Sequence, residues 1–170
     1  TGSHIRRLDA ETALPVTVIE TLELDARGAS TMADLFETVG AADISGITEI
    51  NNGPQQARGD VASVDLRGIG SGSTLVLING RRMAPHPISM AENGVPSLAV
   101  NINAVPRTLI GRVEILRDGA SAIYGADAAA GVINNYISGT FTGRGLAVRG
   151  SVTQHGGASE LGVSAYDAFQ

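Results

Sequence analysis

The sequence predicts an α+β fold, in which a small mixed sheet with short helices is followed by an antiparallel β-hairpin. Three observations lead to this prediction. Short β-branched apolar runs alternate with one amphipathic helical segment, and an Asn-Gly pair joins two apolar runs. Residues 143–170 then alternate between apolar and polar side chains. The 170 residues suffice for one domain of ordinary size with an appendage.

Composition excludes several classes of protein. Apolar residues make up 43% of the chain and charged residues 17%, a balance typical of a folded chain. The net charge is −5 and the 12 basic residues are all arginines, so we expect no nucleic-acid partner. The chain has no cysteine, and its three histidines show no metal-ligand spacing. We therefore expect neither a disulfide framework nor a metal site.

The clearest helix is predicted over residues 31–40, TMADLFETVG, after a strand predicted over residues 16–19, VTVI. Thr31 and Asp34 predict a capping box at the helix start. Gly40 stands where a left-handed residue commonly ends a helix. Apolar residues at helical spacing predict one apolar stripe, formed by Met32, Leu35, Phe36 and Val39.

A strand and a hairpin are predicted in the middle of the chain. VDLRG, at residues 64–68, is typical of a strand, and LVLINGRRMA, at residues 75–84, of a hairpin. Asn79-Gly80 is the expected two-residue turn, because this pair readily adopts positive φ angles. Residues 41–62 and about 85–101 show no sustained period, so they are predicted to be two long loops.

The next segment predicts short elements joined by tight turns. Pro106 suits the first turn of a short helix over residues 106–110. GASAIYG, at residues 119–125, predicts a helical turn or tight loop, and GVINNYI, at residues 131–137, predicts a strand. Residues 112–117 predict a strand with Val113, Ile115 and Arg117 on one face and Glu114 on the other.

The end of the chain predicts two longer strands, over residues 145–153 and 160–169. Each run has about 9–10 residues, the length of a tilted membrane-spanning β-strand. The spacing alone fits an amphipathic hairpin at the edge of a soluble sheet equally well. Asp167 interrupts the apolar face of the second run, so we expect that strand to end or bulge there.

The candidate functional residues are arginines within the strand segments. Each either extends from an edge strand into water or is enclosed and paired with carboxylates of another structure, because an unpaired buried charge is costly. GIGSG, at residues 68–72, lacks the lysine and helix start of a phosphate loop, and no catalytic grouping is seen, so we expect no enzyme. The arginines are Arg67, Arg81, Arg82, Arg112 and Arg117.

The order of these segments resembles the plug domain of TonB-dependent outer-membrane receptors. The resemblance covers about residues 1–139 and is carried by VTVI, TMADLFETVG, VDLRGIGSGSTLVLINGRRM, INAVP and RVEILRDGASAIYGADAAAGVIN. Residues 143–170 resemble the first two strands of the barrel that follows such a plug. TGS at the start resembles the tail of the segment that holds the TonB box. The resemblance implies the outer membrane of a Gram-negative bacterium, with its lipid and the remaining barrel as partners, and TonB binding at or just before Thr1.

The resemblance also implies a transport mechanism without a cofactor. In this family a plug fills a barrel of about 22 strands. A scarce ligand, such as an iron chelate, a saccharide or a similar polar solute, binds outside to loops of plug and barrel. TonB then pulls on the N-terminal segment from the periplasm, and the plug rearranges. We therefore expect ligand contacts in the two long loops, at Asn51, Asn52, Gln55, Gln56, Arg58, His86, Ser89, Glu92 and Asn93.

The resemblance further implies how the plug is seated. Arg67 and Arg117 match arginines that face barrel glutamates in the family, with Glu114 nearby. Two residues depart from the family pattern. Asp118 follows Arg117 where many members have glycine, so we expect it to compete for Arg117. Asn135 replaces an apolar residue, so we expect this strand end to be exposed or to lie in the wet interface between plug and barrel.

Two other classes of protein stay open at this point. A soluble periplasmic ligand-binding or signalling module with a plug-like fold should end near Gly139, and a secretin-type assembly module should self-assemble without a barrel. The alternating runs after residue 143 favour a receptor. Two strands cannot close a barrel, so in the isolated fragment we expect dimerisation or strand swapping through residues 143–170.

Overall fold

The computed structural model describes residues 16–29, 31–40, 42–44, 61–87, 90–92, 95–138, 143–152 and 159–168. The chain divides into two compact units, Thr1–Ile137 and Ser138–Gln170. A mixed sheet with few, short helices confirms the α+β fold class. None of the helices in the described ranges is long and apolar enough to cross a membrane.

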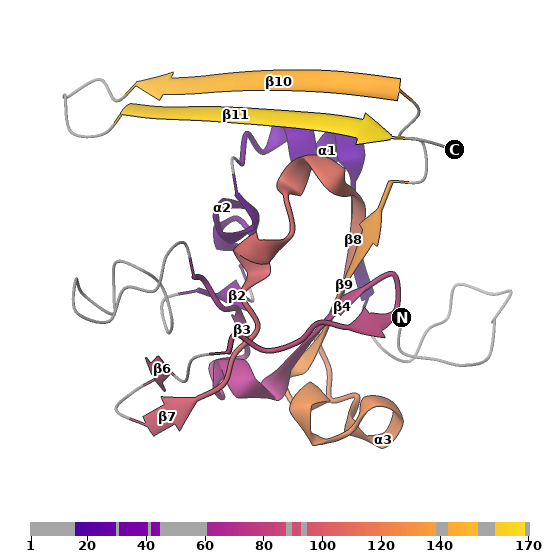
Figure 1. Cartoon of the computed structure of the whole chain (residues 1–170). Coiled ribbons are helices and arrows are strands. Elements are labelled where there is room, and N and C mark those ends of the chain that lie inside the picture. Colours follow the sequence, from indigo (N-terminus) through magenta and orange to yellow (C-terminus); the bar gives the residue numbers. More distant parts are fainter. Residues whose placement is uncertain are drawn as a thin grey trace, which may run out of the picture. The chain divides into compact units, whose positions relative to one another are not determined.

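The first unit is built on a five-stranded sheet with the order β1-β8-β9-β4-β5 (Figure 1). β4 and β9 run parallel, and the other neighbours are antiparallel. Three of these strands confirm the strands predicted near residues 16–19, 112–117 and 131–137. The strands are β1 (Val16–Glu20), β8 (Ile110–Leu116), β9 (Gly131–Ile137), β4 (Thr74–Ile78) and β5 (Arg81–Arg82).

Short elements surround this sheet. Pro106 precedes a 3-10 helix rather than lying in its first turn, which shifts the predicted helix by one residue. Two small antiparallel pairs are β2 (Ala42–Asp43) with β3 (Asp65–Leu66), and β6 (Met90–Glu92) with β7 (Val95–Ser97). The helices are α1 (Thr21–Ala26), α2 (Met32–Glu37), η1 (Ser71–Ser73), η2 (Ile102–Ala104), η3 (Arg107–Leu109), α3 (Ser121–Tyr124) and η4 (Ala126–Ala128).

α2 begins as predicted and ends earlier than predicted. Thr31 Oγ1 accepts a bond from Asp34 N at 3.1 Å, and Asp34 Oδ2 accepts one from Thr31 N at 2.9 Å, which confirms the capping box. The predicted left-handed end at Gly40 is wrong, because Gly40 has no positive φ. Thr38 instead closes the helix: its N–H and its hydroxyl both donate to Leu35 O.

The sequence predicted the turn that follows β4 but not the turn that follows β3. The Asn79-Gly80 turn is confirmed, because φ is 49° and 79° at these residues and Ile78 pairs with Arg81. The strand predicted over residues 64–68 is wrong in its extent. β3 ends at Leu66, since Arg67 and Gly68 have φ of 72° and 67° and turn the chain.

The core lies on both faces of the sheet. On one face, α2 and the loops cover Val76, Val113, Ile115 and Ile133. On the other face, α3 and η4 lie over a second cluster. Burying such a side chain contributes about 1.5–3 kcal/mol, so the two clusters hold α2 and α3 against opposite sides of the same strands. The second cluster contains Leu75, Leu77, Leu116, Ala120, Ala128 and Val132.

The second unit is the hairpin of β10 (Gly143–Val152) and β11 (Ser159–Ala168). The expected bulge at Asp167 is wrong, because the register does not shift there, and β11 ends one residue later, at Ala168. Asp167 is exposed and lies opposite Arg144 in the register of the two strands. Alternate apolar side chains are 63–75% exposed, namely Leu146, Val148, Leu161 and Val163.

Candidate functional site

The structure brings the two arginines that were expected to seat the plug to one end of the five-stranded sheet. Arg67 Nη1 lies 3.9 Å from Asp118 Oδ1, and both side chains are about half exposed, at 51% and 49%. Arg117 Nη2 donates to Thr17 Oγ1 at 2.7 Å. The expected competition of Asp118 for Arg117 is therefore wrong, because Asp118 pairs with Arg67 and also accepts a bond from Gly119 N. We call Arg67, Arg117 and Asp118 the seating site.

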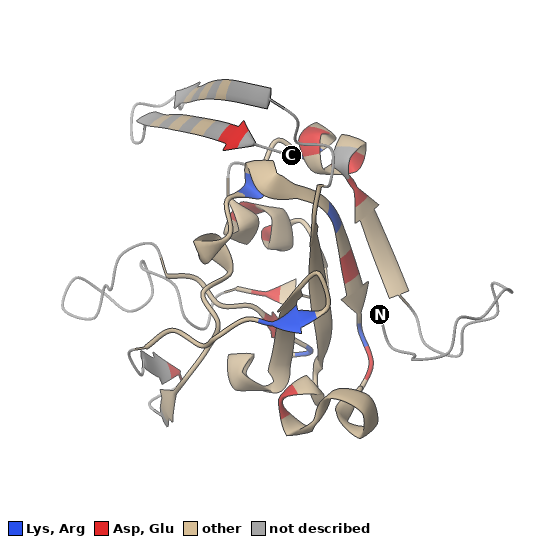
Figure 2. Cartoon of the chain, turned by 45° about the vertical axis from the view of Figure 1, so that its right-hand side comes forward, with Lys and Arg blue, Asp and Glu red and all other residues tan. Residues whose placement is uncertain are grey.

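The charges of the seating site allow it to bind a further acidic group. An exposed ion pair at this separation contributes less than about 1 kcal/mol, so it holds Arg67 weakly. The site holds two guanidinium groups and one carboxylate: Asp118 pairs with Arg67, and Arg117 donates to the neutral Thr17 hydroxyl, which leaves one positive charge in excess. Figure 2 shows acidic and basic residues interspersed over the first unit rather than gathered on one face. The seating site can thus accept a further carboxylate, and arginine binds carboxylates with two parallel bonds.

Gly131 explains why Arg67 and Arg117 lie at the same end. A Cβ at this position would lie 2.4 Å from Leu116 O and 2.8 Å from Leu66 Cδ1. Its φ of 150° is also one that other residues rarely adopt. Leu66 and Leu116 immediately precede the two arginines. The missing side chain of Gly131 therefore lets the ends of β3 and β8 approach closely.

Glu114, the third expected seating residue, is engaged within its own sheet. Its carboxylate lies 3.1 Å from Arg112 Nη2 and accepts a bond from the Tyr136 hydroxyl at 3.3 Å. The guanidinium of Arg112 also lies 4.3 Å from the centre of the Tyr136 ring, a cation–π distance. Sequence reasoning missed this cluster, although the alternation of β8 places Arg112 and Glu114 on one face.

Of the expected ligand-binding residues, the structure describes His86 and Glu92. His86 is half-buried, and its backbone N–H donates to Ala99 O at 2.8 Å. Glu92 points inward: it is 9% exposed and binds Ser71 of η1. Within the described ranges, no three His, Cys, Asp or Glu residues are grouped to hold a metal ion. Outside these ranges lie Asn51, Asn52, Gln55, Gln56, Arg58, Ser89 and Asn93.

Two carboxylates hold the turn formed by residues 67–71, which we call the Arg67 turn. Asp65 accepts bonds from Ile69 N at 3.2 Å and Gly70 N at 2.7 Å. Glu92 accepts bonds from Ser71 N at 3.0 Å and from Ser71 Oγ at 2.8 Å. Burial raises the pKa of Asp65, its two backbone bonds oppose this, and the charges of Glu92 and Asp43 add to the rise.

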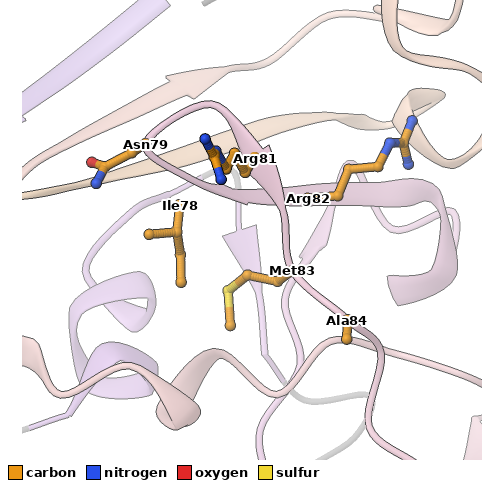
Figure 3. Close-up of a pocket in the computed structure, with 6 residues that line it drawn as sticks. All are labelled: Ile78, Asn79, Arg81, Arg82, Met83 and Ala84. Carbon is orange, nitrogen blue, oxygen red and sulfur yellow. The ribbon is translucent and has the colours of Figure 1, made fainter.

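Arg82 joins the β4–β5 hairpin to the helices α3 and η4. Its guanidinium donates to the Asp127 carboxylate and to Tyr124 O. The hairpin also borders an open depression of about 750 Å³. Figure 3 shows Arg81 near Asn79 and Arg82 pointing away from it, with Ile78 and Met83 on the inner side. Sequence reasoning singled out both arginines but missed the pairing of Arg82 with Asp127.

Asn135 is buried, so the expectation that it exposes the strand end or lies in a wet interface is wrong. It is 3% exposed, and its Nδ2 donates to Leu77 O at 3.3 Å. Its Oδ1 is buried without a hydrogen-bond partner in the structure. The parallel neighbour Ile78 lies beside it in β4. A buried acceptor without a donor costs stability, so Asn135 is a weak point in β9.

Comparison with protein families identifies relatives of the whole first unit. The model of the family described as TonB-dependent Receptor Plug Domain matches residues 9–132. The vitamin B12 transporter BtuB of Vibrio vulnificus (strain CMCP6) is 31% identical over 134 residues, which cover 79% of this chain and 19% of the transporter. The ferric enterobactin receptor PirA of Pseudomonas aeruginosa is 32% identical over 111 residues, which cover 65% of this chain and 15% of the receptor.

Solved structures show the same fold. A mutant of the ferric enterobactin receptor PfeA of Pseudomonas aeruginosa superposes with a TM-score of 0.61 and 25% identity, over 84% of this chain and 20% of that chain. A second PfeA mutant, in complex with enterobactin, gives a TM-score of 0.60 at 25% identity, over 86% of this chain and 21% of that chain. The chain thus spans about one fifth of the length of these relatives, and the predicted resemblance is confirmed.

Proposed function

Because the chain belongs to the TonB-dependent receptor plug domain family, we propose that it gates energised uptake of a scarce ligand across the outer membrane of a Gram-negative bacterium. The observation that carries the proposal is the family match over residues 9–132. The relatives are named as transporters and receptors, and accordingly we assign this chain a transport role and no enzymatic one.

The rest of the protein supplies the barrel in this proposal. A barrel of about 22 strands surrounds the first unit, and Arg67 and Arg117 bind carboxylates of its inner wall. The seating site supports this, since among the described residues Arg67 is held only by the half-exposed carboxylate of Asp118, and Arg117 has a neutral hydroxyl as its partner. Glu114 contributes by fixing Arg112 and Tyr136 on the same sheet.

β10 and β11 form the first two strands of that barrel, with their apolar face toward lipid. Their length of 10 residues each and their exposed alternate apolar side chains support this assignment. The substitution Val163→Arg tests it, because Val163 lies near the middle of β11. In the full-length protein folded into lipid bilayers, the variant should lose about 2–4 kcal/mol. An unchanged stability in bilayers would contradict a lipid-facing position.

The ligand and TonB approach from opposite sides. TonB binds a segment at or just before Thr1, and the ligand contacts the two long loops outside the membrane. The names of the relatives suggest a vitamin B12-like or siderophore-like solute, such as an iron chelate, and a saccharide fits the polar loops as well. The loop residues proposed to contact it are Asn51, Asn52, Gln55, Gln56, Arg58, His86, Ser89 and Asn93, whereas Glu92 is buried against Ser71.

Cell fractionation and uptake together test this function. The full-length protein should be found in the outer membrane, and uptake of its ligand from a panel of labelled iron chelates, cobalamins and oligosaccharides should stop when TonB is removed. Recovery of the protein as a soluble periplasmic binder would favour a binding module instead. Self-assembly into rings without a barrel would favour an assembly module.

The isolated 170-residue fragment has a different expected behaviour. Without further strands, the outer edges of β10 and β11 carry unpaired backbone groups, which favour pairing between chains. We propose that the fragment dimerises or exchanges strands through residues 143–170, and light scattering should then give twice the monomer mass. A fragment ending at Gly139 should be monomeric. A monomeric longer fragment would contradict the proposal.

A further inference from the structure

The Arg67 turn has a backbone that requires outside support. Arg67, Gly68 and Gly70 have φ of 72°, 67° and 105°. Non-glycine residues adopt such angles only when surrounding contacts enforce them, so Arg67 keeps its direction through the bonds made by the rest of the turn. Those bonds go to the two carboxylates described above, Asp65 and Glu92.

Asp65 and Glu92 come from different parts of the chain. Asp65 belongs to β3 and is close to the turn in sequence, whereas Glu92 lies 21 residues beyond Ser71, in β6. β6 pairs with β7 in a two-stranded sheet of its own and is not hydrogen-bonded into the five-stranded sheet. Glu92 therefore links a separate hairpin to the turn that carries Arg67.

The bonds between Glu92 and Ser71 are strong enough that the two residues should move together. A buried carboxylate that accepts bonds from both a backbone N–H and a hydroxyl is held by charge-assisted bonds, which are stronger than neutral ones. If the hairpin moved alone, it would leave a buried charge and a buried amide without partners. A displacement of β6 is thus transmitted to Ser71.

We propose that Glu92 is a positioning residue that couples the β6–β7 hairpin to the direction of Arg67. β6–β7 lies in the second long loop, so a ligand that moves this loop acts at the same time on the turn that holds Arg67. This inference rests on the proposed function only in that Arg67 meets the barrel wall. It gives Glu92 a role different from direct ligand contact.

Hydrogen exchange in the full-length protein tests the link. Glu92→Gln keeps one acceptor oxygen and removes the charge, so the protein should fold while the amides of Ile69, Gly70 and Ser71 exchange about tenfold faster or more. Ser71→Ala, which removes only the hydroxyl, should give a smaller increase. Glu37→Gln, at an exposed carboxylate of α2, is the control and should leave these amides unchanged. Unchanged exchange at all three amides in Glu92→Gln would overturn the proposal.

A double-mutant comparison tests the coupling to Arg67. Cells that make Arg67→Ala, Glu92→Gln or both variants are compared for entry of a large antibiotic that an intact plug excludes. If Glu92 acts through Arg67, the double variant should admit little more than Arg67→Ala alone. Additive effects would overturn the coupling. If Arg67→Ala causes no leak while Glu92→Gln still accelerates exchange, the seating role of Arg67 fails and the link between hairpin and turn stands.

Discussion

The two units of the chain use β-strands in opposite ways. In the first unit both faces of the central strands are covered, with Leu116 buried on one face of β8 and Ile115 on the other. In the second unit the apolar face of β10 and β11 is exposed. The first unit thus covers the apolar faces of its central strands with its own residues, whereas the second does not. The strongest way to test this difference is to make the same substitution in both units.

The largest expected effect is that of Gly131→Ala in β9. The added Cβ would meet Leu116 O at 2.4 Å, and the φ of 150° disfavours alanine, so the free energy of unfolding should fall by about 3–5 kcal/mol. Gly150→Ala in β10 is the matched control, because no atom lies within 4 Å of its Cβ position. Urea unfolding of the chain measures both. Equal effects in the two variants would contradict the close approach at Gly131.

Leu116→Ala and Leu146→Ala compare a covered strand with an uncovered one. Leu116 is fully buried, so its truncation should cost about 2–5 kcal/mol. Leu146 is 71% exposed, so in water its truncation should change stability by less than about 0.5 kcal/mol. Unfolding of the purified chain in water tests the pair. A large loss in Leu146→Ala would mean that the apolar face of the hairpin is covered in solution.

Two buried side-chain amides in β9 test how hydrogen bonds contribute to the stability of the first unit. Asn135→Leu removes an acceptor that has no donor but also the 3.3 Å bond from Asn135 Nδ2 to Leu77 O, so the free energy of unfolding should change by less than about 1 kcal/mol. Asn134→Leu should instead lower it by about 1–3 kcal/mol, because Gly80 N–H loses the Asn134 Oδ1 acceptor at 3.0 Å. Thermal unfolding separates the two. A loss in Asn135→Leu as large as that in Asn134→Leu would contradict the absence of a donor at Asn135 Oδ1.

The smallest expected effect is a pH dependence at Asp65. Burial raises the pKa of Asp65 in the folded state. At pH values above that pKa, the buried ionised carboxylate therefore lowers the free energy of unfolding. As the pH falls from about 7 to about 4, wild type should therefore gain stability relative to Asp65→Asn. Denaturant unfolding across this range measures the difference. A constant difference, or a loss toward acid pH, would contradict the raised pKa.

The sequence predicted those parts of the fold that neighbouring residues determine. The Thr31 capping box and the Asn79-Gly80 turn depend on residues within three positions, and both are found. The side of β8 occupied by Ile115 also follows from simple alternation. Such features depend on local backbone chemistry, so one sequence is enough to predict them.

Contacts between distant residues could not be predicted in the same way. Asp118 pairs with Arg67 rather than with its neighbour Arg117, and Glu92 turns inward to Ser71. The first contact depends on the close approach of β3, β8 and β9 at Gly131, and the second joins residues 21 positions apart, so no local pattern reveals either. Seven of the proposed ligand residues lie outside the described part of the chain, and their role stays a prediction.

In the proposed function, Arg67 and Arg117 seat the first unit as a plug inside a barrel. Entry of a large antibiotic into cells that make the full-length Arg67→Ala/Arg117→Ala variant tests it most directly, with equal amounts of protein in the outer membrane. Cells with the double variant should admit the antibiotic, whereas wild type and the exposed-arginine control Arg81→Ala should exclude it. Continued exclusion by the double variant would contradict the claim.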